Sequence, residues 1–145
     1  MSFIPPGECV NLLALDSHSV LCVTRGGSVF IKAGSVFREV TDDTRIFLLP
    51  LLERRYESVV QELKLKEAEL GLPLAHLMAQ INLSELPFSA FAMRSDYWLG
   101  LALGWISQMG TSAYRELLSG VVEAKWVSQR NRQKAFKLLS GKYSA

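Results

Sequence analysis

The chain has 145 residues, the usual size of one folded domain, with 49% hydrophobic and 21% charged residues. This balance excludes a disordered chain, because a sequence this apolar can bury a core. The formal net charge is only +2, but it conceals an uneven distribution of charge along the chain.

The N-terminal stretch MSFIPPGE does not have the composition of a secretory signal, because it has no basic residue and prolines interrupt its apolar run. The chain has two cysteines, and both are predicted on successive strands joined by a turn over 16–19. The register through that turn would set Cys22 opposite about Leu13 and leave Cys9 beyond the strand end. We therefore expect two reduced thiols and a cytoplasmic protein.

Residues 10–40 are predicted to form an antiparallel meander of short strands with the sequences VNLLAL, VLCVTR, SVFIK and SVFREV. Gly26-Gly27 separates the second strand from the third, and Ala33-Gly34 divides the next pair. Glycine is favoured at these places because it accepts the positive φ that tight hairpin turns require. TRIFLL, ending at Leu49, is a candidate fifth strand, and Pro50 suits the first position of a following helix.

After Pro50 the spacing of the apolar residues changes from two to about 3.6, which predicts helices for the rest of the chain. The first of these helices should end at Gly71, and Pro73 should open a short second one. Strands followed by helices indicate an α+β fold, with four to five short strands and five to six helices packed as antiparallel hairpins. We expect residues 1–145 to form one domain, mainly strands over 1–49 and helical over 50–145, with 71–73 read as a helix turn.

The most apolar stretch of the chain is SDYWLGLALGWISQMG, residues 95–110. Its apolar centre would be about 15 Å long as a helix, and the hydrocarbon core of a bilayer is about 30 Å thick. The stretch therefore predicts no membrane span. Ser95 or Asp96 suits a helix N-cap, and Gly110 suits the residue after a helix. This punctuation favours a buried helix with Trp98 and Trp105 in the core.

Two glycines of that helix, Gly100 and Gly104, are four residues apart and lie on one face. Small residues at this spacing let a second helix approach closely. The face is predicted to pack inside the chain, and a homodimer built on it is the alternative.

Catalytic residue patterns are absent from the sequence, which has no GxSxG, P-loop, HExxH or dinucleotide motif. The two histidines, His18 and His76, have no cysteine or carboxylate at metal-ligand spacing. Asp42-Asp43 is typical of turn or cap chemistry rather than of an acid/base pair. We expect no enzyme activity, no cofactor and no metal.

Charge divides the chain: residues 41–96 carry 6 basic and 9 acidic side chains, whereas residues 97–145 carry 7 and 2. On the last predicted helix, 128–139, Arg130, Lys134 and Lys137 form a basic stripe. Such a stripe fits the phosphates of a nucleic acid. It also fits a solvated helix end favoured by the helix dipole. Arg132 is instead predicted at the core edge, with a packed stem and a head that needs a partner.

The C-terminal third resembles small helical immunity proteins of bacterial polymorphic toxin and contact-dependent inhibition systems. The resemblance is carried by YWLGLALGWI, an intervening amphipathic helix, and KWVSQRNRQKAFKLL. The matching residues of the last helix are Ser128, Gln129, Arg132, Lys134, Ala135 and Leu138. Gln133 stands where the family pattern has a histidine. Most of these are packing positions, and the N-terminal sheet is not covered.

The resemblance implies a protein without enzyme activity that binds a cognate toxin domain in the cytoplasm and occludes its active site or blocks its assembly. Because many such toxins are basic nucleases, the acidic middle of the chain is the expected contact surface. Its candidate residues are Asp42, Asp43, Glu53 and Glu57. The net positive charge departs from that of a nuclease inhibitor and leaves the toxin class open. The alternative function is a nucleic-acid-binding or regulatory protein that uses the basic stripe.

Overall fold

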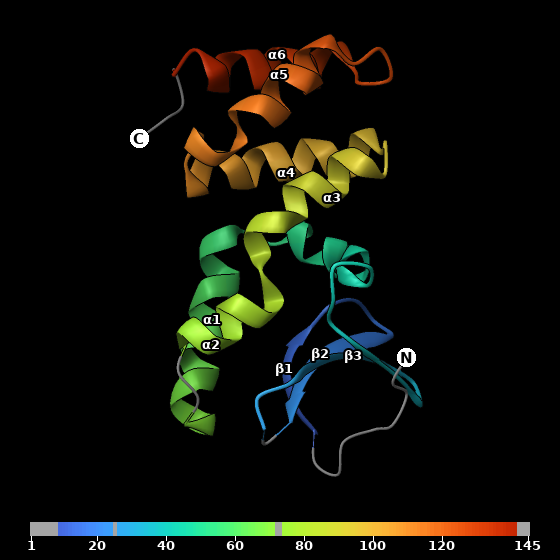
Figure 1. The fold of residues 1–145 in the computed structure, drawn as a ribbon, viewed down its shortest axis with the longest axis vertical. Helices are drawn as coiled ribbons and strands as arrows, with labels where there is room; N and C mark the ends of the chain where they lie inside the picture. Colours follow the sequence, from blue (N-terminus) through green and yellow to red (C-terminus); the bar gives the residue numbers. More distant parts are fainter. Residues whose placement is uncertain (1–8, 25, 72–73, 142–145) are drawn as a thin grey trace. The chain divides into compact units, whose positions relative to one another are not determined.

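A computed structural model describes residues 9–24, 26–71 and 74–141 of the chain (Figure 1). The chain divides into two compact units, Met1–Leu83 and Ser84–Ala145. In the described residues the first unit holds an antiparallel sheet, a 3₁₀ helix and two α-helices, and the second is helical. The predicted α+β fold is confirmed. The division between the units comes after Leu83, beyond the helix turn predicted at 71–73.

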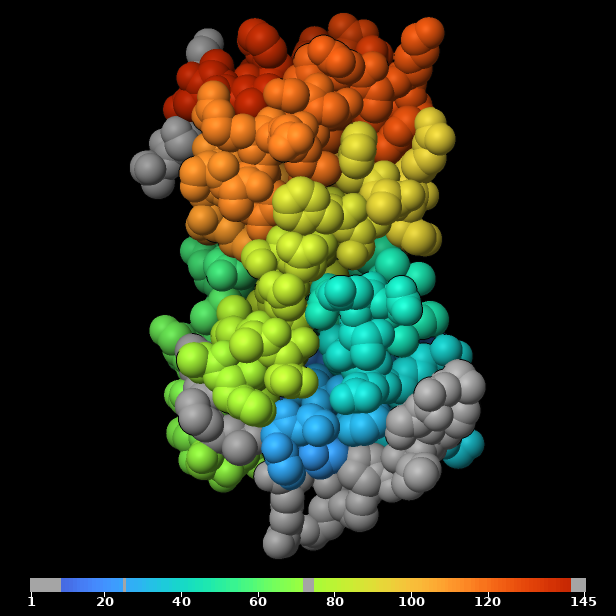
Figure 2. All heavy atoms as spheres, in the orientation of Figure 1, coloured from blue at the N-terminus to red at the C-terminus, as the bar shows by residue number. Residues whose placement is uncertain are grey.

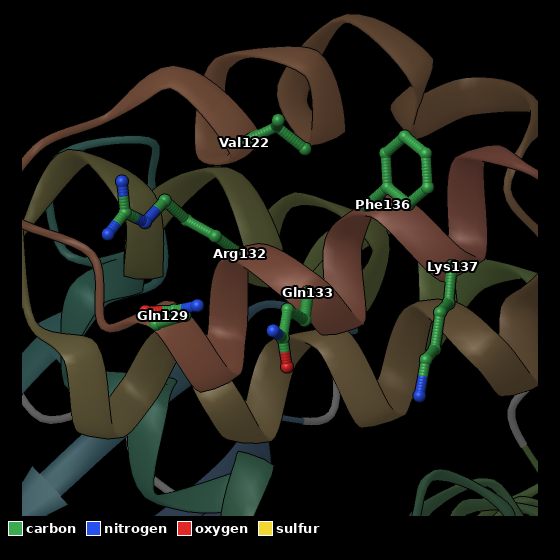
Figure 3. Close-up of a pocket in the computed structure, with 6 residues that line it drawn as sticks. All are labelled: Val122, Gln129, Arg132, Gln133, Phe136 and Lys137. Atoms are coloured by element: carbon green, nitrogen blue, oxygen red, sulfur yellow. The ribbon is translucent and has the colours of Figure 1, made fainter.

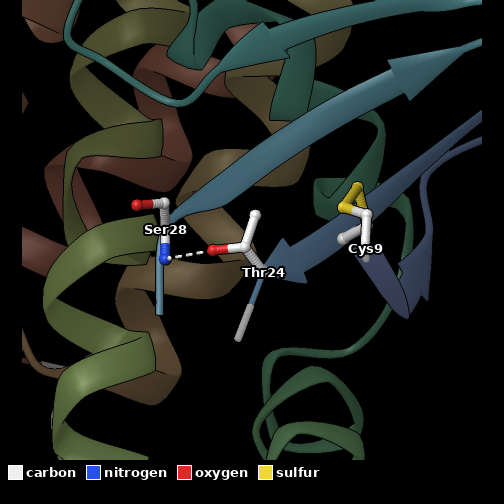
Figure 4. The surroundings of a disulfide bond; sticks show 4 residues. Cys9, Thr24 and Ser28 are labelled. Atoms are coloured by element: carbon white, nitrogen blue, oxygen red, sulfur yellow. Dashed lines mark hydrogen bonds between the residues drawn. A yellow bond between two sulfur atoms is a disulfide. The ribbon is translucent and has the colours of Figure 1, made fainter. Parts of the chain in front are cut away.

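The sheet of the first unit has the order β1-β2-β3-β4, and every neighbouring pair is antiparallel. This is the predicted meander, and its strands are β1 (Cys9–Ala14), β2 (Ser19–Thr24), β3 (Val29–Ala33) and β4 (Val36–Glu39). The turns contain Gly27 at φ +88° and Gly34 at φ +62°, a conformation that glycine adopts at little cost. The β2–β3 turn is longer than the two residues predicted. Ser28 N donates to Thr24 Oγ1 across it at 3.2 Å (Figure 4).

Cys9 and Cys22 form a disulfide, so the expectation of two reduced thiols is wrong (Figure 4). β1 begins at Cys9 itself, and a bulge between Asn11 and Leu13 shifts its register, so that Cys22 pairs with Asn11. Cys9 is then the diagonal neighbour of Cys22, and the two Cα atoms are 5.8 Å apart, a separation that a disulfide spans. A bulge adds one residue to one strand, and here the consecutive residues Leu12 and Leu13 are both buried.

The candidate fifth strand is a 3₁₀ helix, η1 (Arg45–Glu53), and Pro50 lies inside it. The strand prediction fails because Leu48, Leu49, Leu51 and Leu52 are all buried, which is neither the alternation of a half-buried strand nor a helical stripe. α1 (Tyr56–Leu70) begins beyond the expected start, and it ends at Gly71 as predicted.

α2 (Leu74–Ile81) contacts both α1 and β3. Its Leu77 and Ile81 side chains are fully buried. The predicted role of Pro73 in opening this helix lies outside the described residues.

The second unit holds α3 (Leu86–Ala92), α4 (Asp96–Met109), α5 (Arg115–Glu123) and α6 (Gln129–Leu139), with short 3₁₀ turns η2 (Leu83–Glu85) and η3 (Ser112–Tyr114) before α3 and α5. α5 packs along α6, and α4 contacts α3 and α6. Figure 2 shows the orange and red atoms of α5 and α6 as one continuous surface. Trp105 is 3% exposed and belongs to the core as predicted, whereas Trp98 is only partly buried.

α4 begins and ends where the sequence punctuation predicts. Ser95 Oγ accepts a hydrogen bond from Trp98 N at 3.3 Å, and Gly110 follows the helix at φ +101°. A Cβ at Gly100 would lie 3.2 Å from Asn131 Oδ1, so the close approach at this glycine is made by α6 of the same chain. A Cβ at Gly104 would meet nothing within 4 Å. None of the described helices is both long and apolar enough to cross a membrane.

Candidate partner-binding surfaces

The four acidic candidates lie in the first unit and are exposed. Asp42 and Asp43 precede η1, Glu53 ends it, and Glu57 is in the first turn of α1. Arginines accompany Asp42 and Glu57. Arg45 Nη1 donates to Asp42 Oδ1 at 2.7 Å, and Arg55 Nη2 donates to Glu57 Oε1 at 3.4 Å. These ion pairs reduce the negative field that the acidic residues present to a partner.

Arg45 is a buried charged residue that the sequence analysis missed, with 6% of its surface exposed. Its Nε donates to the carbonyl oxygen of Ile81 at 3.0 Å, in addition to the ion pair with Asp42. Asp42 therefore supplies the counter-charge of a buried guanidinium. The i, i+3 spacing of Asp42 and Arg45 would have indicated this ion pair if the segment had been predicted as a helix. A strand over 44–49 does not bring the two side chains together.

The basic stripe is on α6, which Ser128 caps by accepting a hydrogen bond from Asn131 N at 3.2 Å. Its three cations line two different hollows: Arg130 and Lys134 line one, and Lys137 lines the other. The sequence has no acidic residue after Glu123. The segment that contains α6 therefore carries only basic charged side chains.

The α5–α6 hollow is an open cavity of about 710 Å³. Its lining residues are Val122, Gln129, Arg132, Gln133, Phe136 and Lys137. Figure 3 shows the Phe136 ring on the side of α6 that faces Val122, with Lys137 extending the other way. Phe136 is 61% exposed. Arg132 Nε is buried and has no hydrogen-bond partner in the part of the chain that the structure describes, which agrees with the prediction of a packed stem.

The α4–α6 hollow has a volume of about 450 Å³ and lies on the other side of α6. Its lining residues are Asp96, Tyr97, Gly100, Leu101, Ser128, Arg130, Asn131 and Lys134. Asp96 Oδ1 accepts hydrogen bonds from Ser128 N and Asn131 Nδ2, each at 2.9 Å. Burial raises the pKa of Asp96, but these hydrogen bonds and the charge of Arg130 outweigh it and hold the pKa below its ordinary value.

Lys134 reaches into the α4–α6 hollow, where its Nζ donates to the carbonyl oxygen of Gly100 at 3.4 Å. Burial lowers the pKa of Lys134, and the neighbouring charge of Arg130 lowers it further. The two cations are one helical turn apart, at i and i+4, where like charges repel each other.

No group of three or more metal-ligating side chains occurs among the described residues. No protein-family model matches the chain, and neither does any curated protein or solved structure. The resemblance to immunity proteins therefore stays a prediction based on the residues of the C-terminal third.

Proposed function

We propose that the chain is a non-catalytic binding module for a protein partner, and that the partner docks on the α5–α6 hollow. The observation that supports this most is the exposed Phe136 ring, which lines that hollow together with Arg132. Aromatic and arginine side chains supply most of the binding energy of protein interfaces. Polar side chains such as Gln129 and Gln133 fit the rim that surrounds such anchors.

The specific form of the proposal is neutralisation of a bacterial toxin by tight binding, which rests on the resemblance to immunity proteins. Within the resembling helix, Ala135 and Leu138 are buried, and Gln129, Arg132 and Gln133 line the hollow. The helix that carries the resemblance is therefore also the helix that offers a binding surface. The gene of an immunity protein should lie beside that of a large toxin.

The acidic residues expected to meet a basic toxin are a second candidate surface. Asp42 and Glu57 already pair with arginines of the same unit. Electrostatic steering depends on uncompensated charge. The acidic residues are therefore a weaker candidate surface than the α5–α6 hollow.

Nucleic-acid binding through Arg130, Lys134 and Lys137 is the alternative function. Lys134 is partly withdrawn from solvent against Gly100, so only two of the three cations are exposed. Phosphate contacts would make binding weaken steeply with added salt. A gel shift with duplex or single-stranded nucleic acid at about 50 mM salt that disappears at higher salt would favour this alternative.

A cytoplasmic location was expected because the two cysteines were predicted to be reduced. The Cys9–Cys22 disulfide removes this reason for expecting it. Disulfides persist in oxidising compartments and are rare in the cytoplasm. Alkylation of free thiols in intact source cells tests the location. A labelled, reduced pair fits the cytoplasm, and an unlabelled pair assigns the chain to an oxidising compartment.

The proposal is tested by co-expressing the chain with the product of the neighbouring reading frame and measuring their affinity. Phe136→Ala should weaken binding about 30-fold or more, because loss of an interface anchor costs about 2 kcal/mol or more. Leu65→Ala is the matched control, since Leu65 is 60% exposed on the first unit. Equal affinity of both variants and the parent would reject the hollow as the docking surface. Turnover by the isolated chain would reject the binding-module proposal.

A further inference from the structure

The α4–α6 hollow contains two cations and one carboxylate, from Arg130, Lys134 and Asp96. The carboxylate of Asp96 already accepts hydrogen bonds from Ser128 and Asn131. These contacts link the beginning of α4 to the beginning of α6, so Asp96 has a structural role there. With two cations and one carboxylate, the hollow has a net positive charge, and one of the cations is the half-buried ammonium of Lys134.

Lys134 is held in a place that disfavours its charge. Its ammonium has lost part of its hydration and has gained the carbonyl of Gly100, at a long 3.4 Å, and the like charge of Arg130 one turn away. An anion that entered the hollow would offset both the burial and the repulsion, because an opposite charge nearby favours the charged form. No acidic side chain on α6 can do this, since the helix has none.

The size and walls of the hollow indicate what carries the anion. A volume of about 450 Å³ is much larger than a free phosphate ion and lies in the range of small-molecule sites. Tyr97 and Leu101 give the hollow an aromatic and an aliphatic wall. Arginine and lysine supply the charged donors that phosphate and carboxylate groups prefer.

We propose that the α4–α6 hollow binds a small organic oxyanion, with its phosphate or carboxylate group between Arg130 and Lys134 and its apolar part against Tyr97 and Leu101. This site is distinct from the α5–α6 hollow proposed for the protein partner. The two proposals can therefore fail independently.

The test is an NMR titration of the full chain with four probes: inorganic phosphate, phenyl phosphate, benzoate and, as the uncharged control, benzyl alcohol. We expect phenyl phosphate or benzoate to shift the amide signals of Gly100 and Asn131 and to bind at least about tenfold more tightly than inorganic phosphate or benzyl alcohol. Whichever of the two binds more tightly identifies the anionic group. If inorganic phosphate bound as tightly as phenyl phosphate, the proposed preference for an organic ligand would be wrong. No shift at these residues at about 10 mM of any probe would overturn the site.

Variants identify the cations responsible. Arg130→Gln and Lys134→Gln should each weaken binding about tenfold, since each removes a charge-assisted hydrogen bond. Lys134→Arg keeps the charge and should retain most of the affinity, provided that its spectrum matches that of the folded parent. Lys125→Gln removes the same charge from an exposed residue that lines neither hollow and should change nothing. An equal loss in the Lys125 variant would show that only the general field of the unit attracts the anion, and would reject the site.

Discussion

Asp96 and Asn131, at the beginnings of α4 and α6, are joined by two hydrogen bonds from one side-chain amide. Asn131 Nδ2 donates to the Asp96 carboxylate at 2.9 Å and to the Asp96 carbonyl oxygen at 3.0 Å. Asn131 is 5% exposed, so these bonds satisfy a buried polar group that would otherwise be costly. The pair fixes the position of α6 against α4, and thereby the hollow between them.

The first prediction concerns the pH dependence of this link. The folded state lowers the pKa of Asp96, so the folded chain holds its proton less tightly than the unfolded chain does. The stabilisation is therefore fully present above the unfolded pKa, near 3.9, and is lost as the pH falls through the lower folded pKa. Asp96→Asn should lose stability at neutral pH and lose less at about pH 2. Urea unfolding at both pH values measures this, and an equal loss at both would contradict it.

The second prediction compares two glycines of α4. Gly104→Ala should stabilise the chain by about 1 kcal/mol, because alanine is the better helix former and its Cβ would meet nothing within 4 Å. Gly100→Ala gains the same helix propensity but brings a Cβ to 3.2 Å from the buried Asn131 Oδ1. The Asn131 side chain cannot move away easily, because its Nδ2 is hydrogen-bonded to Asp96. We expect the Gly100 variant to be the less stable of the two in urea. The reverse order would mean that Asn131 moves freely.

The third prediction concerns the Cys9–Cys22 disulfide, whose cysteines are 13 residues apart in sequence. A closed loop of this length is worth about 3 kcal/mol through the entropy of the unfolded chain. A reducing agent should lower the unfolding midpoint of the parent. The double variant Cys9→Ala and Cys22→Ala should start lower and should not respond to the reducing agent. A parent whose midpoint is the same with and without reducing agent would contradict the disulfide.

The fourth prediction separates two tryptophans of α4. Trp105→Ala should cost about 3 to 5 kcal/mol, because it leaves a cavity in a close-packed core. Trp98→Ala should cost less, since Trp98 is only partly buried. Urea unfolding followed by circular dichroism compares the two variants. Equal losses would show that burial does not set the difference.

The sequence predicted α4 and α6 nearly to the residue because both begin at a serine cap, at Ser95 and Ser128, and α4 is followed by a glycine. It failed at η1, where consecutive leucines match neither a strand nor an α-helix. The Asp96–Asn131 link joins residues far apart in sequence, and the register of the disulfide depends on a bulge. A local pattern does not predict a contact between such distant residues, whereas the consecutive buried leucines Leu12 and Leu13 mark the bulge.

The candidate sites were predictable to a similar extent. The spacing on α6 placed Arg132 at the core edge, where its Nε is buried, but the three cations of the basic stripe do not line one hollow. It could not show that Phe136 stays exposed, because exposure depends on whether another element covers that face. It also gave no sign that the cations line two hollows, which are formed with α4 and α5.

Docking of a protein partner on the α5–α6 hollow can be followed residue by residue. The most direct measurement is the change in backbone amide NMR signals of the whole chain when the product of the neighbouring reading frame is added. We expect the largest changes at Val122 and over residues 129–137. Changes confined to residues 42–57, with none on α6, would contradict it and assign the partner to the acidic residues instead.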